Sequence, residues 1–483
     1  MLQLNKDILY LIFKELQNDK RSLFSCLTVD RNWCETTVPI LWRNPWKLKR
    51  KILSNVIISH LSDESIENLK SHGIDFFADH YKKPLFNYIR FFKHLDLNNL
   101  NIIIESIVFD IEKSEFSYIF SSIFSIVREE IFNLFINENM RFTHLFIPQQ
   151  LDYQIHLIPG ARLCFSELEF LSCNTRIDDE VFIGLIEICK SVKELELTIE
   201  MDNNNYEIVK LIKATNRLFN IRLLIDGYDE SFCKLLEDSL IKHANSMRYF
   251  KLTRQPATKI ISSFTNLNKL ELSSTSFDNM TTWNCLNNLS LPFLQILKAR
   301  CIPVKVLTDL IKNTSGHLAE IKIDNTFHDE INNKNIIQAI YKNCLKLKYL
   351  KLLIKNSNIL ELEILLVNCQ YLNRLYIITQ NEYYLMFNWN HLFEVLTKSS
   401  PTSLFGFKFC FNKAPRLESL KLFLDNWKNR HSMLLKTFLN CYYMVDRDWS
   451  DEHLNLIEKY KTQGVVEKYD HVSIRRFTVN DPS

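Results

Sequence analysis

The feature that most constrains this chain is a short apolar pattern, in which three aliphatic or aromatic residues stand at positions i, i+3 and i+5. Copies recur along most of the sequence, and between Phe142 and Leu372 their first residues are 20 to 29 residues apart. Repetition at such a period predicts stacked units that share one continuous core. The clearest copies are Val192/Leu195/Leu197, Leu267/Leu270/Leu272, Leu347/Leu350/Leu352, Leu372/Leu375/Ile377 and Leu417/Leu420/Leu422, and a weaker copy is Phe165/Leu168/Phe170.

Segments with a helical period separate these copies. An i, i+3, i+4, i+7 stripe of apolar residues begins at Ile337 and another begins at Leu362. Each unit therefore contains one short strand and one helix, as a leucine-rich repeat does, and the chain is expected to form an α/β solenoid with the strands on its concave face. The polar position after each strand varies along the chain, so we expect an irregular horseshoe. Cys189, Cys344 and Cys369 occupy equivalent corners between helix and strand, which predicts buried and unreactive thiols.

The sequence suggests neither catalysis nor a cofactor. No two of the 7 glycines are closer than twenty residues, so dinucleotide-binding and P-loop motifs cannot be built. His72, Asp75, Asp79 and His80 have metal-capable side chains without a recognised ligand spacing, and no Ser/His/Asp set stands out. We therefore expect a protein that is not an enzyme and needs no metal or cofactor.

The charge balance and the apolar runs bear on partners and location. With 59 Lys and Arg against 56 Asp and Glu, the net charge is +3, too small for a protein that binds nucleic acid by neutralising phosphates. No apolar run approaches the roughly 20 residues of a membrane span. The cysteines show no CxxC spacing, as in a reduced protein. We expect no nucleic-acid or membrane partner, and a cytoplasmic or nuclear location.

Residues 1–46 form a separate block in which three short helices are expected, with Asn5, Ser22 and Asp30 as suitable N-caps. The block resembles the F-box, which opens with Leu-Pro, continues with an Ile-Phe pair and a Trp-bearing helix, and closes with Leu-Trp. Asn5 stands where the family has its proline. The matching residues are Leu4, Ile8, Leu9, Ile12, Phe13, Leu16, Leu23, Val29, Trp33, Leu41 and Trp42.

The resemblance implies a role in ubiquitination. An F-box followed by leucine-rich repeats docks on the Skp adaptor of a cullin ubiquitin ligase, while the repeats hold a target protein near a ubiquitin-loaded enzyme. Two alternatives stay open: the helices would only cap the first edge of the solenoid, or the repeats would form an interaction scaffold unrelated to ubiquitination. The adaptor-binding residues implied are Leu4, Ile8, Leu9, Ile12, Phe13, Leu16, Val29 and Trp33.

The block and the repeats predict four regions. Residues 1–46 are the F-box-like module, and 47–140 are a linker with a helical insertion and a first irregular repeat. The repeat solenoid is expected over 141–425, and C-terminal cap helices and a tail over 426–483.

The residue between the last two anchors of each unit points to the concave face, because side chains alternate along a strand. Early units place Glu169 and Glu196 there, whereas later units place mostly lysine, up to Lys421. We hypothesise that this basic stripe binds an acidic or phosphorylated segment of the target. The alternative is that these are ordinary solvated strand residues. The predicted target-binding residues are Arg222, Tyr249, Lys251, Lys298, Lys322, Tyr349, Lys351, Arg374, Tyr376 and Lys408.

Overall fold

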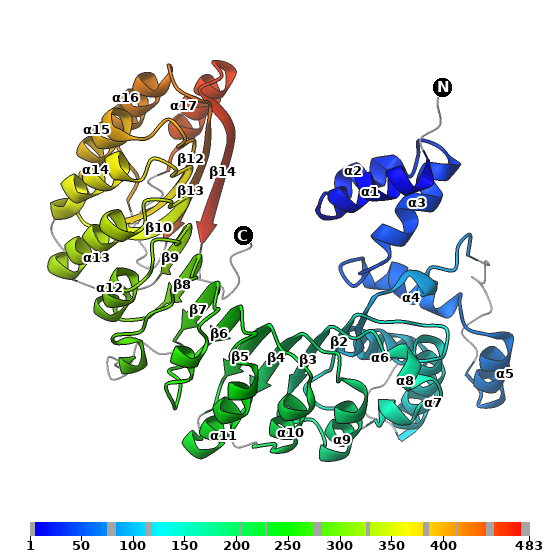
Figure 1. Cartoon of the computed structure of the whole chain (residues 1–483). Coiled ribbons are helices and arrows are strands. Elements are labelled where there is room, and N and C mark those ends of the chain that lie inside the picture. Colours follow the sequence, from blue (N-terminus) through cyan, green and yellow to red (C-terminus); the bar gives the residue numbers. More distant parts are fainter. Residues whose placement is uncertain are drawn as a thin grey trace. The chain divides into compact units, whose positions relative to one another are not determined.

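A computed structural model gives the structure of the chain (Figure 1). It divides into two compact units, Met1–Ser239 and Leu240–Ser483. None of the described helices combines the length and the apolar character that a membrane crossing needs. The residues described are 5–74, 84–112, 118–151, 153–201, 204–227, 229–274, 283–324, 329–379, 386–411, 413–440 and 449–474.

The first unit opens with helices and continues with a ladder of parallel strands. Each strand pairs with the next one in chain order, from β1 to β5. The helices are α1 (Lys6–Glu15), α2 (Lys20–Cys26), α3 (Arg31–Leu41), α4 (Arg50–Ile58), α5 (Asp63–Ser71), α6 (Leu97–Glu112), α7 (Tyr118–Phe135), α8 (Ala161–Cys164), α9 (Asp179–Ile188), α10 (Glu207–Ala214) and α11 (Glu230–Leu240). The strands are β1 (His94–Asp96), β2 (His144–Phe146), β3 (Phe170–Asn174), β4 (Glu194–Ile199) and β5 (Asn220–Ile225).

The second unit continues the same alternation. Its strands also pair in parallel and in chain order, and helices α12 to α17 line one side of the ladder (Figure 1). The strands are β6 (Tyr249–Leu252), β7 (Lys269–Ser273), β8 (Ile296–Arg300), β9 (Glu320–Asp324), β10 (Tyr349–Ile354), β11 (Arg374–Thr379), β12 (Gly406–Phe411), β13 (Met433–Asn440) and β14 (Val466–Ile474). The helices are α12 (Val304–Lys312), α13 (Glu330–Asn343), α14 (Ile359–Asn368), α15 (Trp389–Ser399), α16 (Leu417–Trp427) and α17 (Asp451–Thr462).

The anchors of the repeat form the core of each unit. Leu195 pairs with Ile221 in one ladder and Leu350 with Leu375 in the other, and all four side chains are buried. Burial alternates strictly along β4 and β5, so every second residue faces the helices. The chain is therefore an α/β leucine-rich-repeat solenoid preceded by N-terminal helices, as the sequence predicted. Helices α6 and α7 occupy most of residues 97–135, the segment where a helical insertion was expected.

Two copies of the pattern were assigned wrongly. In the weak copy at Phe165, the strand begins later, and Leu171 rather than Leu168 pairs with Leu145 and Leu195. The copy at Leu417 lies in α16, where i, i+3 spacing also fits a helical face. Two further strands, β13 and β14, lie in the segment 426–483 where cap helices were expected, and they extend the parallel ladder.

Burial accounts for the cysteines as predicted. Cys344 and Cys369 end neighbouring helices, and the Cys369 thiol lies 3.7 Å from the Cys344 carbonyl oxygen. Burial raises the pKa of both thiols to about 12, and it also raises the pKa of Cys189. These thiols are therefore protonated and unreactive at neutral pH.

Individual buried asparagines bond backbone groups where a strand ends, in place of a polar residue repeated in every repeat. The fully buried Asn333 donates to the Leu353 carbonyl oxygen at 2.8 Å and accepts from the Lys355 amide at 3.2 Å. Its side-chain oxygen also accepts a hydrogen bond from Asn358 at 3.1 Å. One amide side chain thus satisfies backbone groups at the end of β10, where the strand turns away.

We expect Asn333→Ala to lower the free energy of unfolding by about 1–3 kcal/mol, because it leaves buried backbone groups without partners. Urea denaturation of the full chain measures the change. Asn335→Ala is the matched control, since Asn335 is exposed on the same helix. Equal stability of the two variants would contradict the structural role of Asn333.

Candidate protein-interaction surfaces

The N-terminal module has its own small core. Leu9 and Phe13 of α1 are buried against Leu23 and Cys26 of α2. Trp33 of α3 packs on Phe13 with their rings 5.1 Å apart. Leu16 also packs against this cluster. Four of the eight residues predicted to bind the adaptor, Leu9, Phe13, Leu16 and Trp33, therefore hold the three helices together.

Other apolar residues of the module remain exposed. On α1, Ile8, Leu11 and Ile12 are 48%, 61% and 45% exposed. Their i, i+3, i+4 spacing places them on one face of the helix. Phe24 of α2 and Val29 before α3 are also exposed. The predicted residues Ile8, Ile12 and Val29 thus remain accessible, the sequence interpretation missed Leu11 and Phe24, and Leu4 lies outside the described residues.

Polar side chains cap the N-termini of the three helices of the module. The Asn5 side chain accepts a hydrogen bond from the Asp7 amide, and Asp30 accepts from the Trp33 amide, so both predicted N-caps are confirmed. The prediction of Ser22 is wrong, because Asp19 is the N-cap of α2. Hydrogen bonds from Ser22 lower the pKa of Asp19, as expected for a capping carboxylate at a helix N-terminus.

The segment after α3 covers the first strand of the ladder. The Arg43 carbonyl oxygen accepts hydrogen bonds from the Lys93 and His94 amides at 3.0 and 3.3 Å. The Trp46 indole donates to the His94 carbonyl oxygen at 2.8 Å. Residues 43–46 therefore satisfy the backbone groups of Lys93 and His94 at the open edge of β1, while the exposed residues on α1 take no part in these contacts.

The concave face of the first unit differs from the expectation at one position. Register places Ser172, rather than Glu169, between Phe146 and Glu196. Arg222 is the next residue in that row, and it lies 3.8 Å from both Glu194 and Glu196. The acidic residues and the arginine therefore offset one another.

A histidine pair lies on the same face. The rings of His94 and His144 stack at 3.8 Å, and His144 stacks on Phe170. Burial, followed by the charges of His144 and Arg43, lowers the pKa of His94 to about 3. The pair is thus neutral at physiological pH and acts as an aromatic surface.

In the second unit, the predicted basic residues stand in one row in register. The row runs from Lys251 through Glu271, Lys298, Lys322, Lys351 and Tyr376 to Lys408. It continues with Lys436 of β13, which the sequence interpretation missed because it treated that segment as a cap. The available signal was the enrichment of apolar, aromatic and β-branched residues over 433–439, which include Thr437 and Phe438. Lys421 does not belong to the row, because it lies on α16.

Acidic residues pair with three of the six lysines in this row, Lys298, Lys322 and Lys351. Glu271 lies 3.0 Å from Lys269 and 2.9 Å from Lys298. Lys322 pairs with Glu320 at 2.9 Å, and Lys351 pairs with Asp324 at 2.5 Å. Several lysines also lie over tyrosine rings, for example Lys322 over Tyr349 at 4.6 Å. The face is a lattice of ion pairs and rings rather than a row of unpaired lysines.

Three of the predicted target-binding residues are too deeply buried for a broad contact. Tyr249, Lys351 and Tyr376 are 8%, 6% and 4% exposed. Tyr376 packs with Cys410 and Phe438, so its role is structural. Arg374 is exposed, and Lys298, Lys322 and Lys408 are half-buried. Lys251 and Tyr349 are half-buried as well, so these six side chains remain accessible on the concave face.

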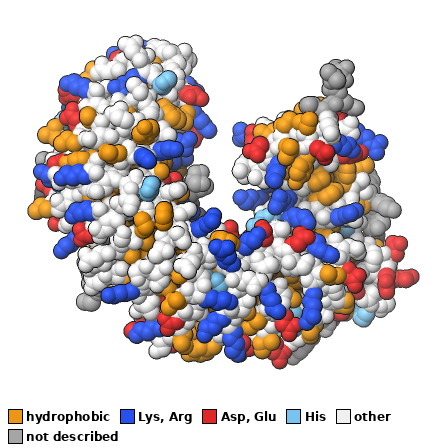
Figure 2. Space-filling model, in the orientation of Figure 1, with side chains coloured by type: hydrophobic (Ala, Val, Ile, Leu, Met, Phe, Trp, Pro, Cys, Tyr) orange, Lys and Arg blue, Asp and Glu red, His pale blue; other side chains and the backbone are white. Residues whose placement is uncertain are grey.

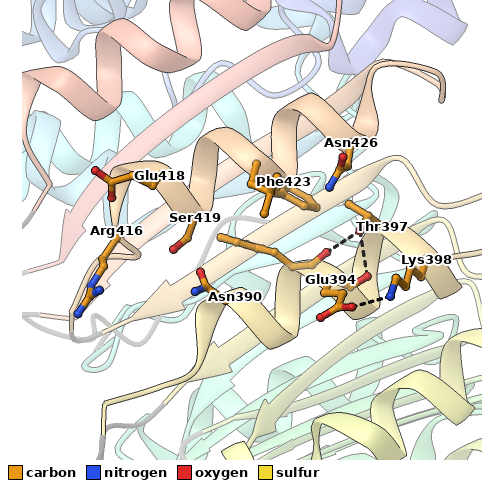
Figure 3. Close-up of a pocket in the computed structure, with 11 residues that line it drawn as sticks. Asn390, Glu394, Thr397, Lys398, Arg416, Glu418, Ser419, Phe423 and Asn426 are labelled. Carbon is orange, nitrogen blue, oxygen red and sulfur yellow. Dashed lines mark hydrogen bonds and ion pairs between the residues drawn. The ribbon is translucent and has the colours of Figure 1, made fainter.

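A groove of about 780 Å³ lies between α15 and α16 (Figure 3). Phe393 and Phe423 stack at its floor at 4.6 Å, and Glu394 pairs with Lys398 on one wall. Its lining contains no histidine or cysteine. Among the described residues no three His, Cys, Asp or Glu side chains gather as metal ligands would.

Comparisons with known proteins bear only on the architecture. No protein-family model and no curated protein matches the sequence. Among solved structures, the chain is similar to the leucine-rich repeat-containing protein LegL7 from Legionella pneumophila, at 16% identity. The match covers 60% of this chain and 87% of that chain, with a TM-score of 0.34. At so low a score, the assignment of the fold rests on the strand register and the buried anchors.

We expect Glu271 to make the second unit sensitive to acid. Burial raises the pKa of Glu271, but hydrogen bonds from Lys298 and Lys269 outweigh burial and bring it to about 2. Since the ordinary value is 4.5, the stabilisation is present above pH 4.5 and is lost as the pH falls toward 2. Glu271→Gln should lower the free energy of unfolding at pH 7 by about 1–3 kcal/mol and flatten this dependence.

Urea midpoints measured between pH 2 and pH 7 check this prediction. Glu418→Gln serves as the control, because Glu418 is exposed on α16. A Glu271→Gln variant that keeps the pH profile of the wild type would show that the pair contributes nothing.

Proposed function

We propose that the chain is the substrate receptor of a Skp-cullin-F-box ubiquitin ligase. The N-terminal module would dock on the Skp adaptor, and the repeats would hold the target protein. The chain performs no chemistry in this mechanism, since it raises the effective concentration of the target lysine near the ubiquitin thioester. The function would operate in the cytoplasm or nucleus.

The observation that carries the proposal is the apolar face of α1. Ile8, Leu11 and Ile12 are exposed although Leu9 and Phe13 on the same helix build the module's core. A helix that is apolar on two faces needs a second partner. The order of the matching residues in the F-box pattern supports the adaptor as that partner.

The alternative of a simple cap explains the geometry less well. Residues 43–46 satisfy the edge of β1, and Trp42 packs on Tyr88 with their rings 4.4 Å apart. A cap would need no exposed apolar face on α1. In the other alternative, a repeat scaffold without a ligase, the concave face would bind a target in the same way. It would differ only in the protein that the N-terminal module binds.

The target would contact the less buried part of the concave face in the second unit. Lys298 and Lys322 retain partial exposure although each pairs with a glutamate. A phosphorylated or acidic segment would compete with those glutamates for the lysines. Binding would therefore depend on how its negative groups are placed relative to the lysines more than on its total charge. The buried Lys351 would serve to position its neighbours.

Adaptor binding should depend on the exposed face of α1. We expect the full-length chain to co-elute with the Skp adaptor and cullin, and Ile8→Asp with Ile12→Asp to weaken adaptor binding at least tenfold, because two carboxylates would enter an apolar interface. Size-exclusion chromatography and calorimetry measure the binding. Circular dichroism should be unchanged, because both side chains are exposed.

Ile52→Asp is the matched control, since Ile52 is 49% exposed on α4, outside the three-helix module. It should bind the adaptor as the wild type does. A folded wild-type chain that does not co-elute with the adaptor would remove the ligase function and leave the interaction scaffold.

A further inference from the structure

Helix α14 uses its charged residues to contact its neighbours. Glu361 accepts hydrogen bonds from Gln338 and Tyr341 of α13 at 3.1 and 3.2 Å. On the other side, Glu363 accepts a hydrogen bond from Ser399 of α15 at 2.8 Å. Lys334 of α13 lies 3.3 Å from Glu361 as well. Both carboxylates thus tie α14 sideways into the helical layer.

The outward face of α14 is consequently mostly apolar, with Asn368 near its end as an exposed polar residue. Leu360, Ile364 and Val367 follow an i, i+4, i+7 spacing and are 58%, 43% and 55% exposed, and Tyr371 in the next turn is 63% exposed. The buried face of the same helix is also aliphatic, with Leu362, Leu365 and Leu366. A helix of an ordinary repeat is polar toward solvent, so this surface is unusual for the layer.

The neighbouring helices show what the layer normally presents. At the outer surface α13 exposes Asn335 and Lys342 together with one apolar residue, Ile331, and α15 exposes Asn390, Glu394 and Lys398. The space-filling view shows apolar side chains among charged ones over α13 to α16 (Figure 2). The four residues Leu360, Ile364, Val367 and Tyr371 are here called the α14 stripe, an apolar strip whose borders are mainly polar but include the exposed Ile331 and Leu345.

One border of the α14 stripe is basic. The contact between Cys369 and the Cys344 carbonyl oxygen brings the ends of α14 and α13 side by side. Lys342 precedes Cys344 by two residues, as Val367 precedes Cys369. Lys346 follows Cys344 by two residues, as Tyr371 follows Cys369. Both lysines are exposed, and within the described part of the chain neither forms an ion pair.

We infer that the α14 stripe binds an amphipathic helix of a partner protein, with acidic side chains along the flank that faces α13. Apolar side chains of the partner would pack on Leu360, Ile364 and Val367 in the way helices dock into apolar grooves. Its carboxylates would pair with Lys342 and Lys346, which fixes the direction of the partner helix.

Size and charge select this occupant over two others. A stable dimer buries about 800 Å² of surface on each partner, and the surface of a strip one helix wide is smaller than that. A second copy of this chain is therefore disfavoured as the partner. An anionic membrane would require unpaired basic residues on both flanks, whereas the lysine of α15, Lys398, is paired with Glu394 at 2.5 Å. A short acidic helix satisfies both observations.

The test uses the full-length chain and two synthetic helical peptides of about five turns. Both peptides carry leucine at i, i+4, i+7 and i+11, and they differ only in having glutamate or lysine on one flank. Fluorescence anisotropy should show at least tenfold tighter binding of the glutamate peptide. The chain with Ile364→Glu and Val367→Glu should lose at least tenfold, and Lys342→Glu with Lys346→Glu should reverse the preference.

Ile183→Glu is the control, since Ile183 is similarly exposed on α9. The inference fails if the α14 variants bind the glutamate peptide as the wild type does, if the two peptides bind alike, or if only vesicles containing phosphatidylserine bind the α14 stripe. The Ile8→Asp and Ile12→Asp chain should bind the peptide normally. Loss of adaptor binding and loss of peptide binding are therefore distinguishable.

Discussion

Burial of one apolar side chain per strand is the interaction on which the rest of the structure depends. At this position Leu195, Ile221, Leu350 and Leu375 are almost fully buried, and each pairs in register with the next strand. A single repeat cannot bury its own apolar face, so every repeat relies on the neighbouring repeats for stability. The outward side chains are placed by the same register, because a strand that is fixed at its anchors has no freedom to rotate.

That register also explains the ion pairs between neighbouring strands on the concave face. Lys298 meets Glu271 because β7 and β8 are in register, although 27 positions separate the two residues in the sequence. Glu271 also accepts from Lys269 on its own strand. Pairs of this kind reduce the free charge and hold the side chains in place, so that recognition depends on their arrangement.

The sequence was sufficient for the fold and insufficient for the surfaces. The repeat pattern predicted most of the parallel strands but missed β13 and β14, and i, i+3 spacing could not separate the strand at Leu347 from the helix at Leu417. In the module, Ile8 and Leu9 are adjacent in an apolar run, and only the packing of α2 and α3 decides that Leu9 is buried. Ion pairs between repeats were equally hidden, since they depend on register rather than on local sequence.

The two apolar surfaces share one physical origin. On α1, Lys6 pairs with Glu35 of α3 at 2.8 Å, and Arg31 pairs with the same carboxylate. On α14, Glu361 and Glu363 contact α13 and α15. The two glutamates of α14 and Lys6 of α1 thus fasten their helices sideways, while Asp7, Lys14 and Glu15 of α1 stay exposed. Both helices present aliphatic residues outward as well as inward, unlike an ordinary amphipathic helix. Hydrophobic contacts have no preferred direction, whereas hydrogen bonds and ion pairs do, so the latter hold such a helix in a fixed orientation. Its outer face can then bind a partner without rearrangement.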